Sequence, residues 1–123
     1  MSLLKEIEEI KKGLPLSYFS KLCREINLPE KRLANVVKIP VSTLATRKKR
    51  GQFTFPESER LARIRRIYNR AVEVFQDNDL AKQWLKEPLF HLNNIAPIDF
   101  IDTELGAKEV EDLLGRIEYG VFS

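Results

Sequence analysis

The amino-acid sequence predicts an all-α protein built from two small modules. Glycine and proline divide the chain into segments, and within each segment apolar residues recur at every third or fourth position, as in helices with one buried face. The only strand-like segment, residues 52–55, is too short to form a sheet. The third observation is size: 123 residues, 43% of them hydrophobic and 32% charged, fit one globular domain or two very small ones that share a core.

Five helices are expected before residue 77. Each is bounded by glycine or proline, which end helices or occupy their first turn. The first helix is expected over residues 3–10 and ends at Gly13 and Pro15, and the second over residues 16–26 ends at residues 27–29. The third covers residues 30–37, and the fourth lies between Pro40 and Gly51. The fifth and longest begins at Pro56, and its inward-facing residues are Leu61, Ile64, Tyr68, Ala71 and Phe75.

The remaining residues predict a smaller helical module. A short helix contains Trp84 and ends at Pro88, and residues 89–100 are irregular. Thr103 then heads a helix that runs to about Ile117 and has a mostly acidic outer face. We therefore expect a domain boundary after residue 76, with one domain over residues 1–76 and the second over residues 77–123.

The distribution of charge separates the same two parts. Residues 1–75 hold 17 Lys and Arg against 8 Asp and Glu, a net charge of +9, whereas residues 76–123 hold 4 against 10, a net charge of −6. A basic part next to an acidic part indicates two partners of different character, with nucleic acid the natural partner of the first. The alternative is that both parts are simply solvated surfaces.

Residues 30–51, EKRLANVVKIPVSTLATRKKRG, predict a helix-turn-helix. The residues expected to pack the two helices together are apolar or small: Leu33, Ala34, Ile39 and Leu44. Two features depart from the usual pattern. Lys38 occupies the turn position commonly filled by glycine, where a left-handed backbone costs about 1 kcal/mol, and Pro40 stands where a Ser or Thr cap is expected.

The second helix of this motif carries hydroxyl and cationic side chains of the kind that read DNA in the major groove. The residues predicted to bind DNA are Ser42, Thr43, Thr46, Arg47, Lys48, Lys49 and Arg50. The first four are expected at base edges, and the last three at phosphates together with Arg63, Arg66 and Arg70 of the next helix. The alternative is that the basic run is solvated, or that the motif packs only against protein.

Enzymatic function is not expected, because the residues for catalysis are missing. Nucleophilic or acid-base catalysis needs two or three groups that converge in a pocket, but the chain has one His and one Cys. His91 lies in an apolar setting and Cys23 has the spacing of a core residue, so neither a zinc site nor a disulfide is predicted. We also expect no cofactor, no membrane span and no signal peptide, and hence a cytoplasmic protein.

The C-terminal part resembles the Xre/MbcA/ParS-type antitoxins, whose genes lie beside those of RES-domain toxins, and the resemblance extends over nearly the whole chain. It is carried by Trp84-Leu85, by the elements PID and DT at residues 97–99 and 102–103, by GA and EVE at residues 106–107 and 109–111, and by LLGRIEYG at residues 113–120. One departure is Asn93-Asn94, where the family often has glycine.

The resemblance implies an Xre/Cro-like helix-turn-helix and a C-terminal domain that binds the toxin and mediates self-association. In the family the toxin consumes NAD, the C-terminal end of the antitoxin obstructs its active site, and the antitoxin represses its own operon. The implied partners are a RES-domain toxin and operator DNA, with a homodimer or a higher assembly. Carried onto this chain, the residues of the obstructing end are Arg116, Glu118, Tyr119, Gly120, Val121, Phe122 and Ser123.

The residues of the tail agree with this role but leave alternatives open. Tyr119 and Phe122 at a chain terminus are suited to anchor an interface, but they could instead fold back on the protein's own core. The main alternative function is a stand-alone repressor whose C-terminal half only dimerises. An antitoxin whose toxin gene has been lost would have the same sequence.

Overall fold

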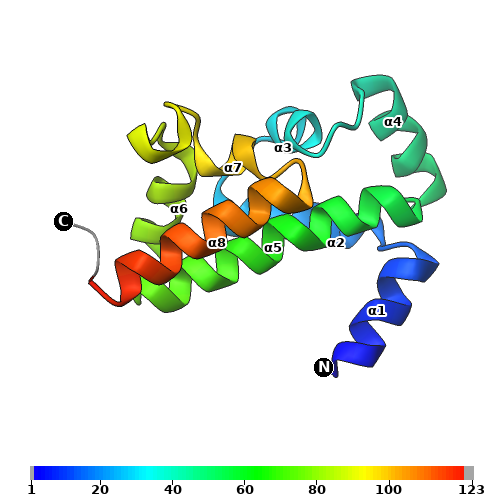
Figure 1. The fold of residues 1–123 in the computed structure, drawn as a ribbon. Coiled ribbons are helices and arrows are strands. Elements are labelled where there is room, and N and C mark those ends of the chain that lie inside the picture. Colours follow the sequence, from blue (N-terminus) through cyan, green and yellow to red (C-terminus); the bar gives the residue numbers. More distant parts are fainter. Residues whose placement is uncertain (1, 121–123) are drawn as a thin grey trace. The chain divides into compact units, whose positions relative to one another are not determined.

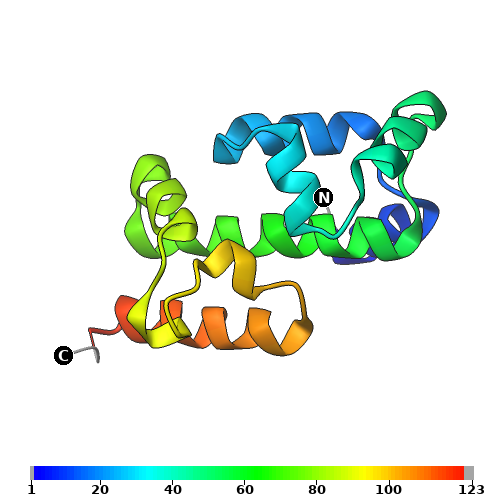
Figure 2. The ribbon, with the colours of Figure 1, turned by 90° about the horizontal axis from the view of Figure 1, so that it is seen from above.

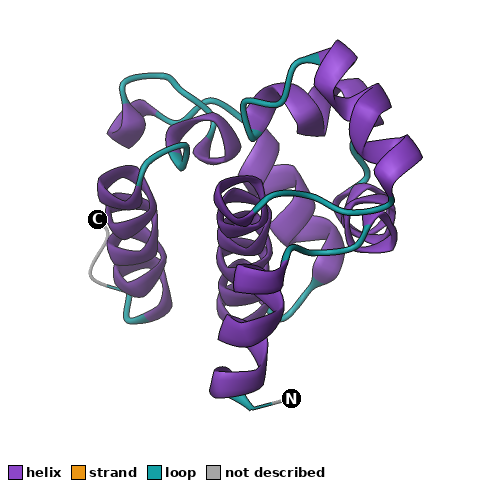
Figure 3. Ribbon diagram, turned by 90° about the vertical axis from the view of Figure 1, so that its right-hand side faces the viewer, coloured by secondary structure: helices purple, strands orange, loops and turns teal. Residues whose placement is uncertain are grey.

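The computed structural model describes residues 2–120, and in that part every regular element is a helix (Figure 3). Residues 15 and 52 form an isolated antiparallel bridge in place of the short strand-like segment, and residues 89 and 95 form a second one. The prediction of an all-α fold is confirmed. The chain divides into two compact units, residues 1–62 and 63–123.

The first unit contains four helices and the beginning of a fifth (Figure 1). They are α1 (Leu3–Lys12), α2 (Leu16–Ile26), α3 (Glu30–Val36), α4 (Val41–Arg50) and the start of α5 (Phe55–Phe75). The core of this unit is formed around α2, whose buried residues include Phe19, packed on Phe53 with ring centroids 5.6 Å apart. Cys23 is buried too, and burial raises the pKa of its thiol to about 11, so the thiol is protonated and unreactive at neutral pH.

The helix-turn-helix consists of α3 and α4, and its four predicted packing residues are all buried. Lys38 adopts the left-handed conformation, with φ of 61°, and Pro40 precedes α4 without a side-chain cap. The turn is held by Ile39 N–H, which donates to the carbonyl of Ala34 at 2.8 Å, and by Arg60 Nε, which donates to the carbonyl of Val37 at 2.6 Å. These hydrogen bonds offset the free-energy cost of the left-handed backbone at Lys38.

Helix α5 begins with a capping box. Thr54 N–H donates to Glu57 Oε1 at 2.9 Å, and Glu57 N–H donates to Thr54 Oγ1 at 3.4 Å, so two backbone donors at the start of the helix are satisfied. The helix then continues without interruption through both units. The two compact units meet between residues 62 and 63, inside α5. The domain boundary after residue 76 stays a prediction.

The second unit contains the rest of α5 and the shorter helices that follow it (Figure 2). These are α6 (Asn78–Lys86), the 3-10 turn η1 (Phe90–Leu92), α7 (Pro97–Phe100) and α8 (Glu104–Glu118). Thr103 caps α8 as predicted, accepting from Gly106 N–H at 3.0 Å. Asn93 and Asn94 both have left-handed backbones, with φ of 59° and 61°, so they take the conformation for which glycine is preferred.

Candidate functional site

The exposed face of α4 carries Ser42 and Thr46, two of the four side chains predicted to contact bases, together with Lys49, which was predicted to contact a phosphate. Ser42, Thr46 and Lys49 are exposed and follow one another at helical spacing, while Leu44 is buried on the opposite side. Thr43 is half-buried. The same exposed face contains Ala45, and Val41 is 59% exposed at the start of the helix. Neither residue was predicted to bind DNA, although its spacing from Ser42 and Thr46 places Ala45 on the same face.

Arg47 faces the other way and is bound within the protein. Its Nε donates to Glu57 Oε1 at 2.7 Å and its Nη2 donates to Glu57 Oε2 at 3.0 Å. The side chain of Arg47 is only 17% exposed, and that of Glu57 only 9%. The geometry suits a role in fixing α4 against the start of α5 better than the predicted contact with bases.

The last turn of α4 is strongly basic. Lys49 and Arg50 are exposed, and Lys48 forms an ion pair with Glu30 at 2.6 Å in which both side chains remain nearly half exposed. Cations at the C-terminal end of a helix are favoured by the helix dipole, so this arrangement is stable without a ligand. It also provides a cationic edge beside the polar face of α4.

The three arginines of α5 that were predicted to meet phosphates instead bind α8, which lies beside α5 (Figures 1 and 2). The shortest contacts are Arg63 Nε to Glu104 Oε1 at 2.8 Å, Arg66 Nη2 to Glu111 Oε1 at 3.2 Å and Arg70 Nη2 to Glu118 Oε1 at 2.7 Å. The glutamates are seven residues apart, two helical turns, and therefore share one face of α8. We therefore do not assign these arginines to phosphate binding.

These ion pairs shift the acid-base properties of their members. Hydrogen bonds from Arg63 lower the pKa of Glu104, and those from Arg70 lower the pKa of Glu118. The hydrogen bonds that Arg70 donates to Glu118 also raise the pKa of Arg70. The carboxylates at both ends of this row are therefore ionised at neutral pH.

The residues predicted to obstruct the toxin at the C-terminal end do not share one environment. Glu118 receives two hydrogen bonds from Arg70, at 2.7 and 3.1 Å, and so belongs to the α5–α8 contact. Tyr119 is 79% exposed and does not fold back on the core. Arg116 is exposed, and Gly120 has a left-handed backbone with φ of 67°. Val121, Phe122 and Ser123 lie outside the described residues.

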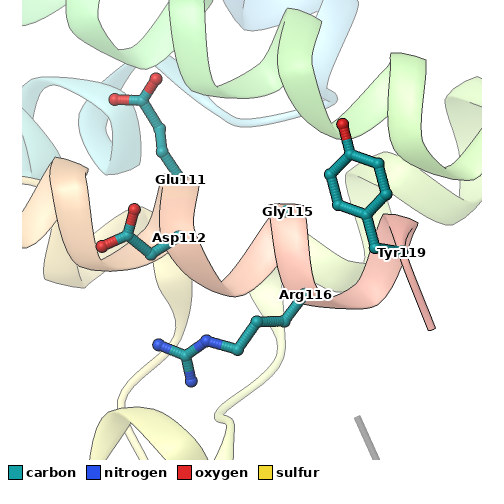
Figure 4. A pocket seen from close by; sticks show the side chains of 5 residues that line it. All are labelled: Glu111, Asp112, Gly115, Arg116 and Tyr119. Atoms are coloured by element: carbon teal, nitrogen blue, oxygen red, sulfur yellow. The ribbon is translucent and has the colours of Figure 1, made fainter. Parts of the chain in front are cut away.

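A hollow of about 640 Å³ is open to solvent on α8 next to these residues, and it is lined by Glu111, Asp112, Gly115, Arg116 and Tyr119. In Figure 4, Glu111 and Tyr119 project to one side of α8 and Arg116 to the other, so that bare helix backbone is presented at Gly115.

Among residues 2–120, no helix is long and apolar enough to cross a membrane. The same residues contain no group of three or more His, Cys, Asp or Glu side chains that could hold a metal ion.

Comparison with known proteins identifies both parts of the chain. Residues 5–66 match the antitoxin Xre-like helix-turn-helix domain, and residues 70–120 match the antitoxin Xre/MbcA/ParS C-terminal toxin-binding domain. An "Antitoxin Xre" from Photorhabdus laumondii is 34% identical over 116 residues, which are 93% of this chain and 78% of that protein.

Two further relatives align with this chain over a similar length. An "Antitoxin Xre" from Yersinia enterocolitica is 35% identical over 119 residues, covering 95% of this chain and 80% of that protein. A "Prs ADP-ribosylating antitoxin" from a Sphingobium species is 22% identical over 124 residues, covering 93% of this chain and 78% of that protein. The matches confirm the resemblance that the sequence motifs indicated: the chain belongs to the Xre family of antitoxins.

Proposed function

We propose that this antitoxin neutralises a RES-domain toxin by occluding its active site with the C-terminal end of the chain, and that it represses its own operon by binding operator DNA through α4. The observation that carries the first part is Tyr119, which extends 79% exposed from the end of α8 in a domain matched to a toxin-binding family. An exposed aromatic side chain at this point is a strong anchor for a protein partner.

The charge of the second module supports a protein partner with a basic cleft. Residues 76–123 have a net charge of −6, and complementary charge speeds encounter and excludes wrong partners. The proposed toxin consumes NAD, so its substrate provides a direct measure of inhibition. The protein would act in the cytoplasm without a cofactor and without catalysing a reaction.

The first experiment measures cellular NAD while the neighbouring toxin gene is expressed with different antitoxin variants. The truncated variant ends at Glu118, because a shorter chain would also remove the Arg70–Glu118 ion pair that holds α8. We expect the full-length chain to preserve NAD and the truncated chain to lose this protection. Full-length Glu118→Gln is the control for a loosened α8, because it disturbs the Arg70–Glu118 ion pair but keeps residues 119–123.

The outcomes separate the possible mechanisms. If the truncated chain protects as well as the full-length chain, the tail is not the inhibitory element. If the neighbouring gene lowers neither NAD nor growth, the alternative of a stand-alone helix-turn-helix repressor, with a C-terminal half that only dimerises, becomes the better explanation.

The proposed DNA-binding surface is the exposed face of α4 with its basic last turn. Ser42 and Thr46 are exposed on the same face as Lys49, and Arg50 is exposed at the end of the helix. The Thr46 hydroxyl donates to the carbonyl of Ser42 at 3.3 Å and keeps its oxygen free to accept from a base. Because one helix-turn-helix reads only a half-site, we propose that a homodimer binds two half-sites about one helical turn apart.

The DNA experiment measures the salt dependence of binding to a fragment from upstream of the operon. The double variant Lys49→Ala/Arg50→Ala is chosen because Lys48 is paired with Glu30, so its removal would disturb the fold as well. If both side chains contact phosphates, the slope of log affinity against log salt falls by about 1.8, since each lost contact removes about 0.9. Lys108→Ala, an exposed lysine on α8, is the control for loss of charge, and an unchanged slope in the double variant would exclude the phosphate role.

A further inference from the structure

Among residues 2–120, nothing in the structure requires glycine at position 115. It lies inside α8, where glycine is destabilising by roughly 0.5–1 kcal/mol relative to alanine. A methyl group built at this position meets nothing within 4 Å, and the backbone is not in the left-handed region.

The other four glycines each have an internal reason. Three of them, Gly13, Gly51 and Gly120, have positive φ angles. The fourth, Gly106, is also in α8, but a Cβ there would overlap the carbonyl oxygen of Phe100. Gly115 alone of the five is unexplained by the conformation and packing of residues 2–120, which points to a close approach by another segment.

The surroundings of Gly115 leave room for such an approach, because they form a shallow surface of α8 that is open to solvent. Gly115 lies among the side chains that line the 640 Å³ hollow, so the helix backbone is accessible between them (Figure 4). Asp112 is exposed in the hollow, and Glu111 is half-buried and held by Arg66. Arg116, one turn further along α8, also lines the hollow, so the partner segment meets both an anionic and a cationic side chain. Tyr119, at the other end, is 79% exposed and provides an apolar wall.

We infer that the toxin docks in this hollow, with a segment that lies directly on the α8 backbone at Gly115 and carries a basic side chain toward Asp112. The inference rests on the proposed function and adds to it the contact surface and the chemistry of the partner segment. The toxin is the favoured occupant because the hollow lies wholly within residues 70–120, the part matched to a toxin-binding domain, and is continuous with Tyr119, where the proposed inhibitory tail begins.

The test uses the full-length antitoxin with Gly115→Ala and Gly115→Leu, and measures both thermal stability and affinity for the purified RES-domain toxin encoded beside the gene. Because Ala and Leu are better helix formers than glycine and meet no internal obstacle, both variants should melt a few degrees higher than the wild type. Toxin affinity should fall about tenfold or more with Ala and further with Leu, because the added atoms occupy the space of the partner segment.

Two further variants locate the effect. Asp112→Asn should weaken toxin binding and reduce its dependence on salt, as expected when an ion pair is lost. Lys108→Ala, on the same helix but outside the hollow, should leave affinity unchanged, and an equal loss there would contradict a contact centred on the hollow. DNA binding should be unchanged in all four variants, because α4 lies in the other unit.

The failure of this inference is distinguishable from that of the proposed function. If the wild type does not bind the toxin, the proposed function fails. If the wild type binds and both Gly115 variants bind equally well, the inference is wrong and the proposed function stands. A lower melting temperature for Gly115→Ala would show that Gly115 has an internal role, which also overturns the inference.

Discussion

Replacing Glu57 by Gln should destabilise the helix-turn-helix unit by about 2 kcal/mol at pH 7. In the wild type the carboxylate accepts two hydrogen bonds from Arg47, at 2.7 and 3.0 Å, and one from Thr54 N–H at 2.9 Å. The amide of Gln can keep the acceptor for Thr54, but its NH2 group then faces the Nη2 donor of Arg47. One charge-assisted hydrogen bond is lost and a half-buried guanidinium loses its counter-charge.

The magnitude follows from how far the pair is buried. Hydrogen bonds to charged groups contribute about 1.5–3 kcal/mol, and breaking a fully buried ion pair costs about 3–5 kcal/mol. The Arg47 side chain is 17% exposed, so water partly compensates the lost charge and the estimate falls near the lower of these ranges. For a chain of this size about 2 kcal/mol corresponds to a melting temperature lower by roughly 6–10 °C.

The same pair makes stability depend on pH. Burial tends to raise the pKa of Glu57, but the hydrogen bonds from Arg47 and Thr54 outweigh it and hold the pKa below the ordinary value of 4.5. A carboxyl whose pKa is depressed in the folded state stabilises the fold fully above its unfolded pKa, and this contribution is lost as the pH falls through the folded value. The difference between wild type and Glu57→Gln should therefore be large at pH 7 and shrink below about pH 4.5.

The assay is urea and thermal denaturation followed by circular dichroism from pH 3 to pH 7. Glu59→Gln is the matched control: the same chemical change two residues further along α5, at an exposed side chain, which should have little effect. Equal stability of Glu57→Gln and wild type at pH 7, or a difference that does not change with pH, would refute the reasoning.

Two other substitutions test the backbone. Lys38→Gly should stabilise the protein by up to about 1 kcal/mol in urea denaturation, because it relieves a left-handed backbone with φ of 61° at a modest cost in unfolded-state entropy; a destabilised variant would mean that the Lys38 side chain contributes more than the strain costs. Gly106→Ala should destabilise by about 1–3 kcal/mol, because its Cβ would overlap the carbonyl oxygen of Phe100. A higher melting temperature for Gly106→Ala would contradict the tight approach of α7 and α8.

Much of the candidate DNA-binding surface could be predicted from the sequence, because it depends on local spacing. The buried packing residues of the helix-turn-helix, including Ala34 and Leu44, follow from helical periodicity, and the structure confirms their burial. The left-handed turn at Lys38 and the cap at Thr103 follow from residue types at known positions of these motifs. Which exposed side chains touch DNA stays a prediction.

The interaction partners of the charged residues could not be predicted in the same way. Arg63, Arg66 and Arg70 are close in sequence to the basic run of α4, and on charge alone they were assigned to phosphates. Their partners lie about forty to fifty residues away on α8, so only packing of the two helices reveals the pairing. Arg47 is similar: its residue type suits base recognition, whereas the tertiary contact with Glu57 holds it inside the protein.

The sequence by itself therefore determined the longer helices, the helix-turn-helix and the family, because these are encoded in spacings of a few residues or in short motifs. It did not reveal η1 and α7, which lie in the segment 89–100 that was predicted to be irregular. Tertiary structure alone decided three other properties: the partner of each arginine, the point inside α5 at which the two compact units meet, and the exposure of bare backbone at Gly115. The physical reason is that helical periodicity and capping act between neighbours along the chain, whereas ion pairs and open surfaces depend on which distant segments pack together.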